Sequence, residues 1–243
     1  MPDQRTDRPE LWVTSLGTID YDEALALQRR LHSVRVDGSI PDVLLLLQHP
    51  RVYTRGRRAE ASELPLGEDW YRERGIAIRD VDRGGKTTYH GPGQLVGYPI
   101  LDTAIVGRDV VRLVRTIEDS LIAALAEEGV AARRDPHGRG VWAGEGKIAS
   151  LGLHIASGVT THGFATNVDC DLEPFTWIKP CGLDDPATSI LEQTGRSHRM
   201  RCFQRRAAFE LASRMGLRQR IISRDRLIEQ LETAESRPLV FAR

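Results

Sequence analysis

The stretch DVLLLLQHP, at Asp42–Pro50, contains the longest apolar run of the chain. An apolar run of this length that ends at a proline predicts a buried β-strand. Upstream of it, LWVTSLG at Leu11–Gly17 predicts another strand, and Tyr21–Val36 predicts a helix between the two strands. Asp20 is a suitable N-cap for that helix, so the chain begins as strand, helix and strand.

Further strands and helices are predicted after this strand. Residues 51–74 are polar and predict a loop-rich segment, whereas apolar residues recur at helical spacing between Asp109 and Gly129. Further strands are predicted at 75–81, 93–101, 140–144, 147–155 and 161–168, and further helices at about 200–215 and at 224–232. These elements predict a single α+β domain with a mixed β-sheet over residues 11–243, preceded by a disordered tail at residues 1–10.

Composition excludes several classes of function. The chain has 34 basic and 34 acidic residues, a balance that does not favour a nucleic-acid binder. No apolar run is long enough to cross a membrane, and the charged first ten residues do not resemble a signal peptide. Three widely spaced cysteines do not form a disulfide framework, so we expect a reduced, cytoplasmic compartment.

The segment RGGKTTYHGPGQLVGYP, at residues 83–99, contains five glycines and two prolines. So little side-chain bulk allows the backbone to lie directly against a ligand, although glycine-rich hairpins also occur for packing alone. The segment has neither the spacing of a P-loop nor that of a dinucleotide-binding motif. On its own it therefore leaves a ligand site and an ordinary turn equally open.

Two side chains suggest nucleophilic chemistry. Cys181 lies between Pro180 and Gly182, a setting that suits either a nucleophile or a packing residue at a turn. Lys147 opens a strand among apolar and small residues, where partial burial would lower its pKa and a nearby thiol would ionise more easily. A lysine at a solvated strand end is the more common alternative.

A metal site is the other interpretation of these residues. His90, His162, Cys170 and Cys181 are all possible ligands. They form no C-x-x-C and no H-x-x-x-H, and the gaps between them are long and irregular. We therefore expect no metal.

Four segments in this order resemble the lipoyl(octanoyl) transferases, also called octanoyl-[acyl carrier protein]:protein N-octanoyltransferases. The segments are RGGKTTYHGPGQLVGYPI (83–100), GKIASLGLHI (146–155), THGFATNVDCDL (161–172) and FTWIKPCGL (175–183). The resemblance extends from about Leu11 to about Leu191. Beyond about Thr194 the family varies, so the helices from about residue 199 gain nothing from it.

The resemblance implies a mixed β-sheet flanked by helices, a fold shared with biotin protein ligases and lipoate–protein ligases. It also implies transfer of an octanoyl group from octanoyl-acyl carrier protein to a lysine of lipoyl domains. These acceptors belong to 2-oxoacid dehydrogenase complexes and to the H protein of glycine cleavage. The reaction is the first step of endogenous protein lipoylation, and we expect no cofactor for it.

Carried over by position, Cys181 matches the acyl-thioester nucleophile, and Lys147 matches the lysine that lowers the pKa of that thiol and serves as acid and base. The acyl-binding positions fall on Arg83, Gly84, Gly85, Lys86, Thr87, Thr88, Tyr89, His90, Ser150, Leu151, Gly152, Gly163, Phe164 and Ala165. Many members have glutamine in place of Lys86, whose charge we expect to face solvent or the carrier protein.

Further expectations concern residues around this set. Gly84, Gly85, Gly91 and Gly93 are expected to keep an apolar slot open for the acyl chain. Cys170 and Cys202 match no functional position and are expected to be small packing residues. The segment RVYTRGRR at 51–58 has four arginines and no acid, so it is either the docking site for an acidic carrier protein or an ordinary solvated loop.

Three alternatives remain open from the sequence. An ATP-dependent lipoate–protein ligase shares the fold but needs no cysteine nucleophile. A cysteine hydrolase would use His162 or His90 as its base and would leave Lys147 unexplained. A non-catalytic module that binds an acylated protein would never acquire the acyl group.

Overall fold

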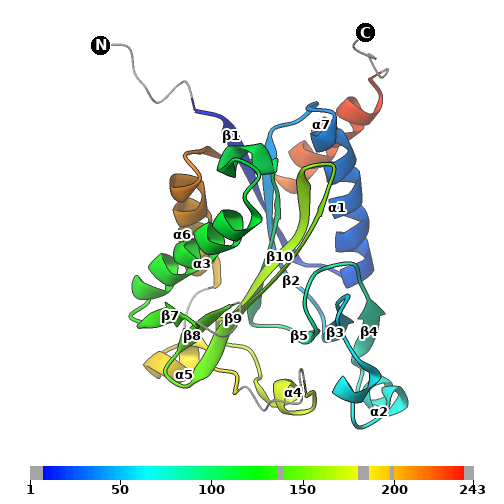
Figure 1. The fold of residues 1–243 in the computed structure, drawn as a ribbon, viewed down its shortest axis with the longest axis vertical. Helices are drawn as coiled ribbons and strands as arrows, with labels where there is room; N and C mark the ends of the chain where they lie inside the picture. The colour runs from blue at the N-terminus through cyan, green and yellow to red at the C-terminus, as the bar shows by residue number, and fades with distance from the viewer. Residues whose placement is uncertain (1–7, 136–139, 180–185, 198–199, 238–243) are drawn as a thin grey trace.

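The computed structural model describes residues 8–135, 140–179, 186–197 and 200–237. Its centre is an eight-stranded sheet with the order β11-β1-β2-β6-β10-β9-β8-β7 (Figure 1). Strand β1 pairs in parallel with β2 and β11, and the other pairs are antiparallel, which confirms the predicted mixed sheet. The strands are β1 (Glu10–Thr18), β2 (Asp42–Gln48), β6 (Gln94–Ile100), β7 (Ala132–Arg134), β8 (Val141–Ala143), β9 (Gly146–Ala156), β10 (Val159–Asn167) and β11 (Arg218–Ile221).

Helices cover both faces of this sheet. In Figure 1, α3 (Val110–Ala126) and α6 (Met200–Arg214) lie on one side of it, and α1 (Tyr21–Val36) and α7 (Arg224–Glu235) lie on the other. The apolar run of β2 explains why two layers are needed. Leu44 and Leu46 belong to the core on the α3 side, whereas Leu45 and Leu47 belong to the core on the α1 side. Successive side chains of a strand point to opposite faces, so both faces must be covered.

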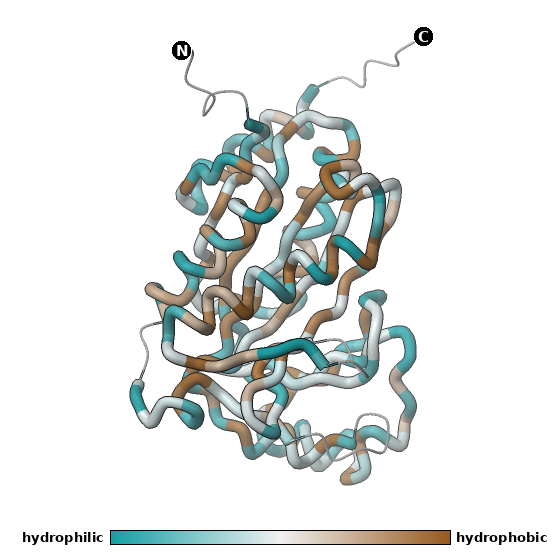
Figure 2. The backbone as a smooth tube through the Cα atoms, turned by 60° about the vertical axis from the view of Figure 1, so that its left-hand side comes forward, coloured by the Kyte–Doolittle hydropathy of each residue, from teal (hydrophilic) through white to brown (hydrophobic). Residues whose placement is uncertain are grey.

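Side-chain caps fix where the predicted helices begin. Asp20 accepts a hydrogen bond from the Asp22 backbone N–H (2.8 Å), and Asp109 accepts from the backbone N–H groups of Val111 and Arg112 at the start of α3. Hydrophobic and hydrophilic residues alternate along these helices in Figure 2, as expected for helices that pack one side against a sheet. No helix in the described ranges is both long and apolar enough to cross a bilayer.

Residues 51–74 are not the loop-rich segment that their polarity predicts. They contain β3 (Val52–Arg55) and α2 (Glu68–Glu73), with a 3₁₀ turn at Ala61–Glu63. Strand β3 lies between β4 (Ala77–Asp80) and β5 (Thr87–His90) in a separate three-stranded sheet. Its core is aromatic, with Tyr53, Tyr71 and Tyr89 all fully buried. A strand of four residues is too short for the period-two pattern to reveal it.

Other short elements also escaped prediction. They are β7, β11, α4 (Glu173–Thr176), α5 (Ile190–Thr194) and the 3₁₀ turn at Thr103–Val106. The strands predicted at 147–155 and 161–168 are confirmed as β9 and β10, which form a hairpin of 11 and 9 residues. Strand β8 pairs with β9 only as far as Ala149, so the outer part of the hairpin keeps one open edge. That edge carries the candidate site.

Candidate functional site

A cavity of about 1310 Å³ lies between the β9–β10 hairpin, the glycine-rich loop and the α4 segment. Nearly all of the predicted site positions line it together: Arg83, Gly84, Gly85, Lys86, Thr87, Thr88, His90, Lys147, Ser150, Leu151, Gly152, Gly163, Phe164 and Ala165. Tyr89 is the exception, because its ring is buried beside Tyr53 and Phe175. The fold thus gathers three distant segments at one place, and their role in binding an acyl chain stays a prediction.

Because Gly84 and Gly152 have no side chains, the glycine-rich loop can pack directly against β9. The Gly84 backbone N–H donates to the Leu153 carbonyl at 2.9 Å, and a Cβ at Gly152 would lie 2.7 Å from the Gly84 oxygen. Gly91 and Gly93 do not have the role expected for them, because they do not line the cavity. A Cβ at Gly93 would lie 2.7 Å from the backbone of Cys170, so this glycine serves chain packing.

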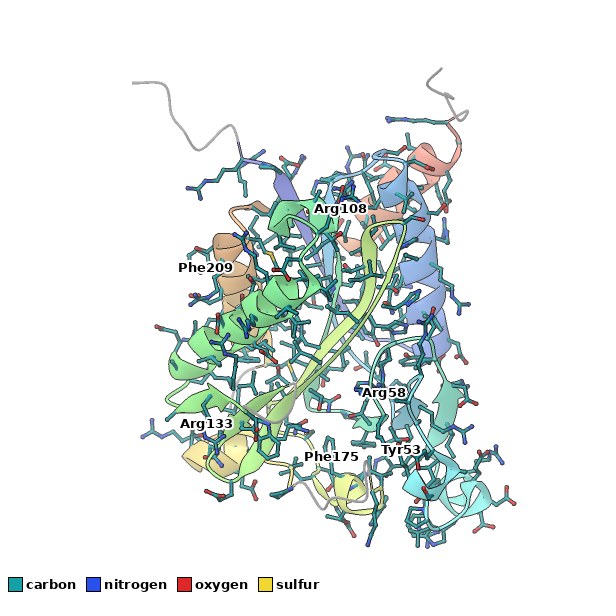
Figure 3. All side chains as sticks on the ribbon, in the orientation of Figure 1. Tyr53, Arg58, Arg108, Arg133, Phe175 and Phe209 are labelled. Carbon is teal, nitrogen blue, oxygen red and sulfur yellow. The ribbon has the colours of Figure 1, made fainter. Side chains whose placement is uncertain are left out.

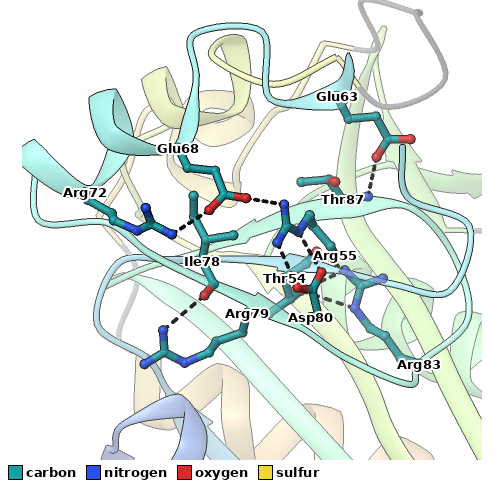
Figure 4. Close-up of polar contacts among 10 residues, drawn as sticks. All are labelled: Thr54, Arg55, Glu63, Glu68, Arg72, Ile78, Arg79, Asp80, Arg83 and Thr87. Carbon is teal, nitrogen blue, oxygen red and sulfur yellow. Dashed lines mark hydrogen bonds and ion pairs between the residues drawn. The ribbon is translucent and has the colours of Figure 1, made fainter. Parts of the chain in front are cut away.

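Arg83 places a buried cation in the wall of the cavity. Its guanidinium donates to the Thr54 carbonyl (2.5 Å) and hydroxyl (2.7 Å) (Figure 4). It also donates to the Gly84 carbonyl (3.1 Å). Burial lowers the pKa of Arg83 from its ordinary value. Within the described part of the chain its guanidinium donates to hydroxyl and carbonyl oxygens, which are neutral, so the cavity wall has a site suited to developing negative charge.

The charge of Lys86 was expected to face solvent or the carrier protein, but it is paired within the chain instead. Its ammonium lies 3.1 Å from carboxylate oxygens of both Glu60 and Glu63. The Glu63 carboxylate also accepts from the Thr87 backbone N–H at 2.8 Å. Burial alone would raise the pKa of Glu63, but the hydrogen bonds from Thr87 and Lys86 outweigh it and lower that pKa. The lysine therefore fixes the loop to the 3₁₀ turn at Ala61–Glu63.

Lys147 is held by its backbone against the chain that follows the predicted nucleophile. Its N–H donates to the Pro186 carbonyl at 2.7 Å, and its carbonyl accepts from the Thr188 N–H at 3.1 Å. Its ammonium lies 4.9 Å from the centre of the Trp142 ring, over the ring face. Cys181 itself lies in residues 180–185, outside the described residues.

The two flanks of residues 180–185 are attached to different sheets. Before them, the Lys179 N–H donates to the Glu63 carbonyl (3.1 Å), and the Tyr53 and Tyr71 hydroxyls each donate to a carbonyl of the α4 segment at 2.6 Å. After them, Pro186 is bonded to Lys147 in the large sheet.

The two histidines of the site are neutral at pH 7. His90 donates from Nδ1 to Gln94 Oε1 (2.7 Å), and burial together with His49 lowers its pKa to about 3. Burial also lowers the pKa of His162, although Asp82, 2.7 Å from its Nε2, acts in the opposite direction. Among the residues that the structure describes, no three acidic, histidine or cysteine side chains are grouped as a metal would need.

The cavity also has polar residues that the sequence did not single out. Tyr21 and Tyr98 line it, and the Tyr98 hydroxyl donates to His49 Nε2 at 2.7 Å. Asn167 lines it too and bonds to Gln94 at 3.0 Å. Gln94 and Asn167 lie within the segments that resemble the lipoyl(octanoyl) transferases, and this position is the signal by which they could have been found from the sequence.

The arginine-rich segment is not an ordinary solvated loop, and its role in docking a carrier protein stays a prediction. Its first half is β3, and Arg55 pairs with Glu68 of α2 (2.5 Å) and Asp80 of β4 (2.7 Å) (Figure 4). Arg57 and Arg58 remain exposed, and Arg58 lines the cavity (Figure 3). A role in docking the carrier protein would therefore fall on Arg57 and Arg58.

The other cysteines differ from each other. Cys170 is buried, as expected for a packing residue, and burial raises the pKa of its thiol to about 12. Cys202 is exposed on α6, so the packing role expected for it is wrong.

Known proteins are similar to this chain in sequence or in fold. Residues 20–212 match the family model of the lipoyl protein ligase A/B catalytic domain. An octanoyltransferase of Solibacter usitatus is 50% identical over 178 residues, which cover 73% of this chain and 81% of the relative. An octanoyltransferase of Mycobacterium tuberculosis is 48% identical over 189 residues, which cover 76% of this chain and 78% of the relative.

Solved structures agree on the fold. The bipartite lipoate protein ligase of Thermoplasma acidophilum superposes with a TM-score of 0.66 at 17% identity, over 94% of this chain and 93% of that one. Lipoate-protein ligase A bound with ATP gives a TM-score of 0.66 at 16% identity, over 95% of both chains. These similarities confirm the α+β fold that was expected.

Proposed function

Because the chain belongs to the lipoyl protein ligase A/B catalytic domain family and is similar over most of its length to octanoyltransferases, we propose that it transfers octanoyl groups. The donor is octanoyl-acyl carrier protein. The acceptor is a lysine of a lipoyl domain in a 2-oxoacid dehydrogenase complex or in the H protein of glycine cleavage. As the composition and cysteine content suggest, we place the reaction in the cytoplasm.

The shape and lining of the cavity support two-step transfer of an acyl chain. Its volume of about 1310 Å³ exceeds the roughly 300–1,000 Å³ of an ordinary small-ligand pocket, leaving room for the chain and for an arm of either protein substrate. Leu151, Leu153 and Phe164 supply apolar surface beside the glycine-rich loop. Burial of an alkyl chain contributes about 0.8 kcal/mol per CH₂, so the depth of this surface selects chain length.

The single observation that carries the mechanism is the backbone pairing of Lys147 with Pro186 and Thr188. It attaches the lysine to the chain that leads from Cys181. The ammonium would favour the Cys181 thiolate, which attacks the thioester carbonyl; the C–S bond to the carrier breaks and the acyl-enzyme forms. The departing carrier thiolate takes a proton from Lys147 and leaves as a thiol, so that Lys147 becomes neutral. The amine of the acceptor lysine then attacks the acyl-enzyme, a C–N bond forms and the C–S bond breaks. Lys147, once neutral, accepts the proton that the amine loses.

The geometry favours this mechanism over a cysteine hydrolase. A general base works best with a pKa near the working pH, whereas that of His90 is lowered to about 3. His162 has Nε2 engaged with Asp82, and its Nδ1 is buried without a hydrogen-bond partner among the described residues. The low pKa of His90 makes it a poor base, and Nδ1 of His162, the nitrogen that Asp82 does not engage, is buried away from solvent, so we favour Lys147 as the partner of the thiol.

We expect the chain to become acylated without ATP. Incubation with octanoyl-acyl carrier protein alone should add the mass of one octanoyl group, and addition of an apo-lipoyl domain should move that mass to the acceptor. Intact mass spectrometry of both proteins measures this. A ligase would instead require free acid and ATP, and a binding module would gain no mass under either condition. Either result would overturn the proposal.

Docking of the carrier protein is expected to depend on Arg57 and Arg58. Reversal of both to Glu should raise KM for the acidic carrier at least about tenfold and flatten its dependence on salt, because exposed charges steer association. Transfer from a small octanoyl thioester should fall much less, and Arg57→Glu alone, at the position that does not line the cavity, should leave it unchanged. Arg115→Glu, at an exposed position of α3, is the control. Equal losses with both donors would show that the two arginines support the fold or the cavity instead.

A further inference from the structure

A chain of buried hydrogen bonds connects the glycine-rich loop to the backbone that holds Lys147. Asn167, the last residue of β10, is 4% exposed and lies opposite Gln94 of β6. Its Oδ1 accepts from Gln94 Nε2 at 3.0 Å, and its Nδ2 donates to the Thr188 carbonyl at 2.9 Å. Asn167 thus joins the large sheet to residues 186–188.

The partners fix the orientation of each amide in this chain. Gln94 Nε2 faces two oxygens, those of Asn167 and of the Tyr89 carbonyl (3.2 Å), so Gln94 Oε1 must be the acceptor for His90 Nδ1. The Asn167 oxygen then faces a donor, and its amino group faces the Thr188 carbonyl. Every partner is complementary, and a fully satisfied buried network holds one geometry.

Thr188 is fixed by hydrogen bonds from its backbone and its side chain and by close packing against Gly146. Its N–H donates to the Lys147 carbonyl at 3.1 Å, and its hydroxyl donates to Glu192 at 2.7 Å. A Cβ at Gly146 would lie 2.8 Å from the Thr188 Cβ, so this glycine lets Thr188 pack closely beside Lys147. Residues 186–188 therefore lie between the Lys147 backbone on one side and the Asn167 side chain on the other.

We infer that Asn167 is a positioning residue for octanoyl transfer: its amide fixes residues 186–188 against the Lys147 backbone. The inference rests on the proposed function of Cys181 and Lys147. Asn167 is not required to touch the reacting atoms. Its loss should disturb the setting of Lys147, and with it the activation of the thiol that we propose, while the carrier protein still binds.

Asn167→Leu keeps the branching of the side chain and removes both hydrogen bonds. Thr160→Val is the matched control, because it also removes buried bonds between a β10 side chain and the backbone, to Pro99 and Leu101. Thr160 lies seven residues from Asn167, or about 23 Å along an extended strand. Thermal unfolding of both variants calibrates the general cost of losing such bonds.

In Asn167→Leu, kcat with octanoyl-acyl carrier protein should fall at least about tenfold while KM stays within about twofold. The pH midpoint for alkylation of Cys181 by iodoacetamide should rise toward that of a free thiol. Thr160→Val should lose similar thermal stability and change neither quantity. Should Asn167→Leu fail to fold, Asn167→Ser, which can still donate to a carbonyl, should show both changes at smaller size.

An unchanged alkylation midpoint in Asn167→Leu, or equal shifts in Thr160→Val, would overturn the inference. Failure of the proposed function looks different, because the wild-type chain would then never take up the octanoyl mass. The alkylation comparison needs no substrate, so it decides the position of the thiol in either case.

Discussion

Replacement of Cys181 by serine is expected to abolish acyl transfer, with a fall in kcat of at least about 10³-fold. The expected mechanism needs an anionic nucleophile, and the thiolate is accessible near neutral pH when a cation lies beside it. A hydroxyl in the same place stays protonated, so it attacks the thioester far more slowly. Intact mass spectrometry should find no octanoyl group on the Cys181→Ser chain after incubation with octanoyl-acyl carrier protein.

The other two cysteines provide internal controls for this result. Cys202→Ser changes an exposed side chain and should leave both stability and transfer unchanged. Cys170→Ser places a hydroxyl in a buried position and should lower thermal stability while most of the activity remains. Octanoyl mass that persists on Cys181→Ser and disappears from one of the other two variants would reassign the nucleophile.

The sequence predicted well those elements whose patterns are long. The apolar run of β2 predicts a strand covered on both faces, and Asp20 and Asp109 mark helix starts that the structure confirms. The small sheet could not be predicted in the same way. Strand β3 has four residues, and its partner β5 is hidden inside the glycine-rich segment. In that sheet it is tertiary packing among buried tyrosines that decides the structure.

Charge was the least reliable guide at the site. The sequence shows the arginines of residues 51–58 as one basic run, because the acids that pair with Arg55 are distant in sequence. Lys86 was misjudged for the same reason, since Glu60 and Glu63 precede it by more than twenty residues. Positions that depend on glycine fared better at the cavity, where Gly84 and Gly152 are in close contact. A glycine can be read directly from the sequence, whereas the partner of an ion pair cannot.

Lys147 is expected to have two roles, and two replacements can separate them. Lys147→Ala removes the cation, so the thiolate loses its stabilisation and the alkylation midpoint of Cys181 should rise to or above the free-thiol value of about 8.5. Transfer should fall by about 10²–10⁴-fold, more than the smaller thiolate fraction explains, because the acceptor amine also loses its proton acceptor. The midpoint is measured with iodoacetamide, and transfer is measured with an apo-lipoyl domain.

Lys147→Arg keeps a cation beside the thiol but cannot give up its proton, since guanidinium stays charged in proteins. The alkylation midpoint should therefore remain low and acylation by octanoyl-acyl carrier protein should continue. The acyl-enzyme should then accumulate, because the acceptor amine attacks only after it is deprotonated. Rapid transfer from the Lys147→Arg acyl-enzyme would show that the lysine is not the proton acceptor. Coincident midpoints in wild type and Lys147→Ala would show that it is not the partner of Cys181 at all.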